Sequence, residues 1–175
     1  MSSLKYQYCK NRVSSGTPLL IHELSHRPSS PPSVSALHLL QSALSSPYPP
    51  SNPSSPPLSF DLEVIDSKPP TPDQIHTILS YASPESQTSP DLSKFISSHP
   101  TAPSPSERPK NANEVVRLGT ENPNILKWPI VVDWHGGRAS IGDVEGVKGI
   151  LEAIRQERDG ESKGEEEYKP KGWFS

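Results

Sequence analysis

The stretch of residues 126–154, LKWPIVVDWHGGRASIGDVEGVKGILEAI, constrains the fold more than any other part of the chain. Residues 130–132 form a short apolar run that predicts a buried strand, and residues 138–141 predict the strand that returns. Between them, Gly136-Gly137 can adopt the positive φ angles that a tight hairpin needs. Apolar residues at helical spacing follow from Val144 to Ile154. The stretch therefore predicts a strand, a hairpin turn, a second strand and a helix.

Two elements are predicted near the start of the chain. Residues 19–22 are a short apolar run that predicts the first strand, and residues 25–32 are expected to form a loop. Apolar residues at helical spacing then predict a helix from residue 31 to about residue 44. Ser30 suits the N-cap of this helix, and Pro31 suits the first helical position, where a missing N–H costs nothing.

The next two elements complete a repeating order. Residues 59–65 alternate apolar and polar side chains, which predicts a strand with one buried face. Thr71 and Gln74 form a capping-box pattern at the start of a helix that extends to about Ala82. The full order is β-α-β-α-β-β-α, with a parallel first pair and an antiparallel hairpin. This order predicts an α/β fold of thioredoxin-like type, a four-stranded mixed sheet flanked by helices.

Serine and proline mark the segments that are expected to lie outside the core. The 175 residues include 22 prolines, more than twice the ordinary usage of about 5%. We expect a disordered or targeting N-terminus at 1–18 and a thioredoxin-like domain at 19–156. The domain is expected to carry flexible insertions at 45–57 and 83–113, the second with a short helical piece around residues 92–96. A charged, disordered tail is expected at 157–175.

Composition and motifs argue against several classes of function. The net charge of −3, without a long basic run, does not favour a nucleic-acid partner. No apolar run approaches the roughly 20 residues that cross a membrane. The only cysteine, Cys9, cannot form an internal disulfide or a CxxC pair. His22, His26, Asp133 and His135 match no metal-ligand spacing. We therefore expect no metal and no cofactor. We further expect a monomer whose partner is a small-molecule or peptide ligand.

The first 22 residues predict where the protein resides. They contain Lys5, Lys10 and Arg12 with several serines, and no acidic residue precedes Glu23. Basic, acid-poor segments of this kind are typical of mitochondrial targeting signals. The alternative is an ordinary disordered N-terminus.

Four segments carry a family resemblance: 26–33, 68–74, 128–134 and 137–143. In these segments the chain resembles a fungal family of mitochondrial redox proteins with a thioredoxin-like fold and, more distantly, the arsenate reductase branch. The similarity spans residues 19–82 and 126–154. It implies a mitochondrial oxidoreductase acting on small molecules or thiols.

The resemblance also implies where the site lies and how this chain departs from the pattern. Ser30 and Ser33 occupy the positions of a redox pair at the start of the first long helix, so the catalytic positions hold no thiol. A serine hydroxyl titrates far above a thiol, which excludes dithiol exchange there. Trp128 and Pro129 are expected to face these serines across a substrate groove, with a cis bond between them.

Two hypotheses of different kinds therefore stand. One is an oxidoreductase of the redox-protein family, for which Cys9 is the only thiol in the chain. The other is a redox-inactive binding module for a peptide or an anion.

Overall fold

The computed structural model describes residues 21–83 and 91–161. A single sheet has the strand order β2-β1-β3-β4. Its strands are β1 (Ile21–His26), β2 (Asp61–Asp66), β3 (Ile130–Asp133) and β4 (Arg138–Ile141). β1 and β2 are parallel, whereas β3 is antiparallel to both β1 and β4. The predicted thioredoxin-like α/β fold is confirmed.

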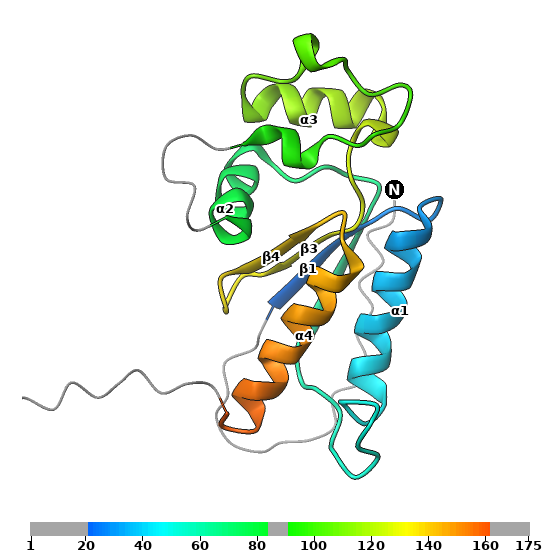
Figure 1. The fold of residues 1–175 in the computed structure, drawn as a ribbon, viewed down its shortest axis with the longest axis vertical. Helices are drawn as coiled ribbons and strands as arrows, with labels where there is room; N and C mark the ends of the chain where they lie inside the picture. Colours follow the sequence, from blue (N-terminus) through cyan, green and yellow to red (C-terminus); the bar gives the residue numbers. More distant parts are fainter. Residues whose placement is uncertain (1–20, 84–90, 162–175) are drawn as a thin grey trace, which may run out of the picture.

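The described part of the chain contains four α-helices, three of which lie against the faces of the sheet (Figure 1). The four are α1 (Pro31–Ser45), α2 (Pro72–Ala82), α3 (Ala112–Glu121) and α4 (Val144–Arg158). Helices α1 and α4 pack together on one face, around Leu24, Val131 and Leu151. Helix α2 lies on the other face, and α3 packs against α2. None of the described helices is long and apolar enough to cross a membrane.

The structure confirms the predictions that rest on short sequence patterns, namely a helix cap, the hairpin turn and the cis peptide bond. Thr71 and Gln74 form both hydrogen bonds of the capping box at the start of α2. Asp143 caps α4 by accepting hydrogen bonds from two backbone N–H groups, and Gly137 turns the β3–β4 hairpin with φ of 63°. The peptide bond between Trp128 and Pro129 is cis, as predicted.

The first strand is longer than the sequence indicated. Its predicted residues were 19–22, followed by a loop from residue 25, but β1 extends to His26. The prediction of a loop at residues 25 and 26 was wrong because these strand residues are polar and nevertheless buried. His26 is accommodated by a hydrogen bond between its ring and the Ser33 hydroxyl.

The structure also contains ordered elements between residues 91 and 125. The short helical piece predicted around 92–96 is the 3₁₀ helix η1 (Leu92–Phe95). Two further 3₁₀ helices, η2 (Pro105–Glu107) and η3 (Pro123–Ile125), flank α3. Helix α3 was not predicted; its Gly119 lies so close to Leu126 that a Cβ would be 2.4 Å from Leu126 Cδ1.

The segments expected to be flexible have defined contacts where the structure describes them. Leu58 N–H donates to Ala43 O, and Tyr48 N–H donates to Pro56 O. The first contact ties the end of the segment 46–57 to α1, and the second joins the two ends of the segment to each other. Helix α4 ends at Arg158, so the start of the predicted charged tail is helical. The flexibility of the insertions stays a prediction, and residues 1–20, 84–90 and 162–175 lie outside the described residues.

Candidate functional site

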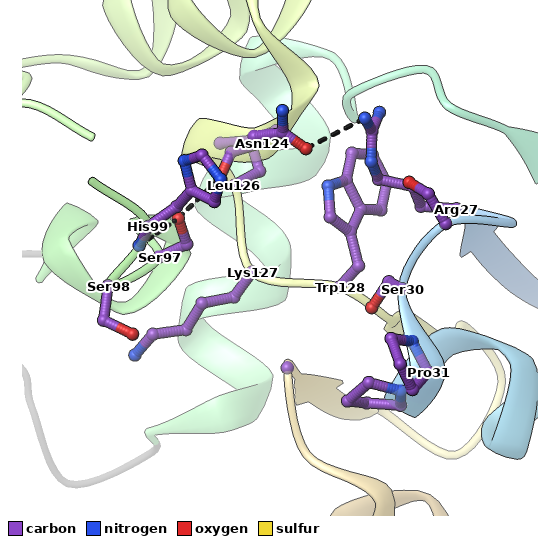
Figure 2. A pocket seen from close by; sticks show the side chains of 13 residues that line it. Arg27, Ser30, Pro31, Ser97, Ser98, His99, Asn124, Leu126, Lys127 and Trp128 are labelled. Atoms are coloured by element: carbon purple, nitrogen blue, oxygen red, sulfur yellow. Dashed lines mark hydrogen bonds between the residues drawn. The ribbon is translucent and has the colours of Figure 1, made fainter. Parts of the chain in front are cut away.

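A cavity of about 610 Å³ opens at the end of the sheet where β1 and β4 finish and β3 begins. Its lining comes from four places: the β1–α1 loop with the start of α1, the segment after η1, the segment from η3 to β3, and the turn after β4 (Figure 2). The lining residues are Arg27, Ser29, Ser30, Pro31, Pro32, Ser97, Ser98, His99, Asn124, Leu126, Lys127, Trp128 and Gly142. Ligands of open α/β sheets commonly bind at such strand ends.

The lining is basic. It includes Arg27, Lys127 and His99 and holds no aspartate or glutamate in the described part of the chain. Arg27 donates a hydrogen bond of 2.9 Å from Nη2 to Asn124 Oδ1, which is a neutral acceptor. Among residues 21–83 and 91–161, neither Arg27 nor Lys127 forms a salt bridge. The cavity therefore presents positive charge that is not neutralised by its own walls.

The two serines at the start of α1 lie in different environments. Ser30 lines the cavity at the N-cap position, and its hydroxyl makes no capping hydrogen bond. Ser33 is fully buried behind it. The Ser33 hydroxyl accepts a hydrogen bond from Arg27 N–H at 2.9 Å and lies 2.9 Å from His26 Nδ1. Ser33 thus holds the β1–α1 loop in place rather than facing the cavity.

The start of α1 offers few backbone donors to an anion. The first two helical positions are Pro31 and Pro32, which have no N–H. The N–H of Ser30 already donates to Arg27 O, at 3.0 Å. Positively charged side chains, and not the helix terminus, are therefore the groups of this site that can hold an anion.

Trp128 and Pro129 differ in their relation to the cavity. Trp128 lines it, and its indole Nε1 donates to Pro123 O at 2.7 Å. The residue is only 6% exposed, so the ring forms part of the buried wall of the cavity and offers a ligand little surface. Pro129 is buried beneath, and its carbonyl accepts a hydrogen bond of 2.7 Å from Gly142 N–H. Cys9 lies outside the described residues, and no other cysteine is present in the chain.

Sequence reasoning did not identify Arg27, His99, Asn124 and Lys127. Two of them could have been identified from their positions in the sequence. Arg27 directly follows the first strand, and Lys127 directly precedes Trp128-Pro129. Residues next to strand ends that meet at one edge of a sheet are candidates for a binding site. His99 and Asn124 reach the cavity through the 3₁₀ segments, for which the sequence carries no comparable signal.

Of the four residues weighed as metal ligands, His22 and Asp133 lie opposite each other on β1 and β3, whereas His26 lies at the other end of β1. His26 bonds to Ser33, and the buried Asp133 accepts hydrogen bonds from Gly136 N–H and from Arg138 Nη1. His135 is exposed on the hairpin. Within the described ranges, no group of three or more acidic, histidine or cysteine side chains is arranged to hold a metal ion.

Two buried titratable groups of β1 lie outside the cavity lining. Burial lowers the pKa of His22, against a smaller opposite effect of the Asp133 carboxylate. Neither His22 ring nitrogen has a hydrogen-bond partner among the described residues. Burial raises the pKa of Glu23, and hydrogen bonds from Trp134 and Gln74 partly oppose that rise.

The fold and the cavity define a thioredoxin-like α/β domain that has a basic pocket, with Ser30 and Ser33 at the start of α1. Residues 21–142 match the family described as "Protein of unknown function (DUF1687)", and the chain belongs to that family. Among solved structures, the chain is similar to "Putative arsenate reductase from Yersinia pestis". That match has 19% identity and a TM-score of 0.46, and it covers 75% of this chain and 98% of the other. No curated protein matches the chain.

Proposed function

We propose that this chain is a thioredoxin-like binding module whose pocket holds the anionic group of a small molecule or peptide. The observation that carries the proposal is the charge of the cavity. The Arg27 guanidinium has only a neutral amide as its hydrogen-bond partner in the described structure, and no acidic side chain lines the walls. Apolar surface for the rest of a ligand comes mainly from Pro31 and Pro32, which are exposed in the lining.

Nucleophilic chemistry at the helix start has no support from the geometry. The Ser33 hydroxyl is buried and engaged with Arg27 N–H and His26. Among the described residues, the Ser30 hydroxyl forms no hydrogen bond with a side chain that could act as a base. A serine hydroxyl titrates far above a thiol, and a helix terminus contributes at most about 2 kcal/mol to an anion beside it. The proposal therefore assigns binding, not turnover, to these positions.

Anion binding can be tested by titrating the protein with phosphate and with acetate while amide chemical shifts are followed by NMR. We expect shifts confined to residues around the cavity, weakened by added salt. The variant Arg27→Gln should lose most of the response. The matched control is Arg117→Gln, which removes an exposed arginine that pairs with Glu121 on α3. Shifts that are unchanged in Arg27→Gln would refute the proposal.

The redox-protein function remains the competing candidate, and the observed thioredoxin-like topology is what favours it. In this chain it would depend on Cys9, the only thiol. The purified full chain and its Cys9→Ser variant should be compared in a thiol-dependent reduction assay. Turnover that disappears in Cys9→Ser would replace the binding-only proposal with an oxidoreductase acting on small molecules or thiols.

We also propose a mitochondrial location and a monomeric state. The location rests on the basic, acid-free sequence before Glu23. A fluorescent fusion should reach mitochondria, and replacing Lys5, Lys10 and Arg12 by glutamine should prevent this. Sedimentation analysis should give one mass, that of a single chain.

A further inference from the structure

The cations of the cavity lie on opposite sides of it. Figure 2 shows Arg27 and Ser30 on one side of the pocket and the side chains of Lys127 and Ser98 on the other. A negative group on either side pairs best with the nearer cation, because the attraction between charges falls with distance and is screened by solvent. The arrangement therefore suits two separate negative groups.

The side of the cavity that holds Arg27 is fixed by three contacts. The backbone N–H of Arg27 donates to Ser33 Oγ, and its Nη2 donates to Asn124 Oδ1. Asn124 is itself held, since Ser97 Oγ donates to its carbonyl oxygen at 2.6 Å. A guanidinium has five N–H donors, so this one retains donors for a carboxylate.

The side that holds Lys127 offers donors of a second kind. The backbone N–H of Lys127 donates to Phe95 O at 2.8 Å, which fixes the base of the side chain. His99 Nδ1 accepts a hydrogen bond from Thr101 N–H at 3.2 Å. The same Nδ1 lies 2.8 Å from Thr101 Oγ1, so Thr101 holds the His99 ring in place at the cavity. The Ser98 hydroxyl lines the same side.

Apolar groups also line the cavity: Pro31 is exposed beside Ser30, and Leu126 and Trp128 form buried parts of the wall. Pro31 and Leu126 have no polar side-chain atoms, and the indole N–H of Trp128 is already used. We propose that the pocket binds a ligand with two carboxylates joined by a short apolar spacer, one carboxylate at Arg27 and the other at Lys127. This inference rests on the proposed anion-binding function and names its ligand class.

The test uses α,ω-dicarboxylates from succinate to azelate beside monocarboxylates of the same chain length. Binding to the full chain is followed by NMR titration, with sodium chloride adjusted so that every sample has the same ionic strength. We expect the best dicarboxylate to bind about two- to fivefold more tightly than its matched monocarboxylate, since each partly exposed ion pair contributes modestly. Affinity should pass through a maximum as the spacer lengthens.

Two variants assign the two ends. Lys127→Gln should reduce the dicarboxylate to the affinity of the monocarboxylate while leaving the monocarboxylate at Arg27 unchanged. Lys110→Gln, an exposed lysine outside the cavity lining, is the control and should change neither. Equal affinity of dicarboxylates and monocarboxylates, with Arg27 still required, would overturn this inference and leave the anion site standing. No binding of either series would overturn both proposals.

A peptide arm identifies the source of the two carboxylates. A capped Glu-Ala-Glu peptide is compared with capped Gln-Ala-Gln in the same titration. Tighter binding of the acidic peptide than of any free diacid supports the two-carboxylate chemistry with a peptide as its source. The reverse order supports the same chemistry with a free dicarboxylic acid.

Discussion

Arg27 Nη2 donates a hydrogen bond of 2.9 Å to Asn124 Oδ1, although 97 positions separate the two residues in the sequence. The bond joins the β1–α1 loop to η3 and so connects two walls of the cavity. An amide oxygen orients a guanidinium without carrying a compensating charge. The pocket thus has an ordered cation whose charge is still available to a ligand.

The variant Asn124→Asp tests this arrangement. A carboxylate in the place of the amide would form a charge-assisted pair with Arg27 and compete with any bound anion. We expect anion affinity to fall about five- to tenfold, which corresponds to about 1–1.4 kcal/mol. NMR titration with acetate is the measurement. Asn113→Asp, at an exposed position of α3, makes the same change of charge away from the cavity and should have little effect. Equal losses in the two variants would point to net charge and not to this contact.

Much of the fold could be predicted from the sequence because its signals are local. The capping box at Thr71 and the glycines of the β3–β4 hairpin act within four residues, so they can be recognised without tertiary information. Helix α3 was missed although Asn111 and Glu114 form a capping pattern there. Its ten residues follow directly on a Ser/Pro-rich region, and the helix is stabilised by packing on α2. Such packing is not visible in the sequence.

The site was less predictable than the fold for the same reason. Ser30 and Trp128 were identified because the resemblance marks their positions, and both line the cavity. The hydrogen bond between Arg27 and Asn124 depends on how distant segments meet. The burial of Ser33 could not be predicted either, since serine is usually exposed.

Ser33→Ala should destabilise the protein, whereas Ser30→Ala should have little effect. The Ser33 hydroxyl is buried and serves both Arg27 N–H and His26 Nδ1, so its loss leaves two polar groups without this partner. We expect a loss of about 1–3 kcal/mol in the free energy of unfolding, measured with urea. Ser30 occupies an N-cap position but makes no side-chain capping bond, so its substitution should cost less than about 0.5 kcal/mol. Equal stability of the two variants would contradict the structural role of Ser33.

The buried His22 should make stability depend on pH. Its folded-state pKa lies below the ordinary value of 6.5 because burial disfavours the charged ring. The unfolded chain therefore binds the proton more readily, and the stability contributed by the neutral ring is present above pH 6.5. It is lost as the pH falls through the folded-state pKa. Each unit of lowering corresponds to up to about 1.4 kcal/mol.

Urea unfolding of wild type and His22→Leu across pH 5–8 isolates this effect. Leucine removes two ring nitrogens that have no partner among the described residues, so the variant should gain stability relative to wild type as the pH falls below 6.5.

The neighbouring Glu23 has the opposite effect on the stability of the protein. Its pKa is raised, so its contribution to stability is present at low pH and is lost as the pH rises through that pKa. It is present in both proteins and cancels in the difference. His38→Leu, at an exposed position of α1, is the control. A difference independent of pH would exclude His22 as the source.

Arg158 is expected to order the proline-rich segment 46–57. It donates from Nη1 to Pro56 O at 2.6 Å and from Nη2 to Tyr48 O at 3.0 Å, so one forked group holds both ends of the segment. Arg158→Lys keeps the charge but not the planar fork, and it should cost about 1–2 kcal/mol of unfolding free energy. Hydrogen exchange gives the local measurement: the amides of Tyr48 and Leu58, which donate within this region, should exchange faster.

The control is Arg117→Lys, on the exposed face of α3, which should change the free energy of unfolding by less than about 0.5 kcal/mol. If both amides exchange in Arg158→Lys as they do in wild type, then the packing of Leu58 and Tyr48 on α1, and not the arginine, holds this segment.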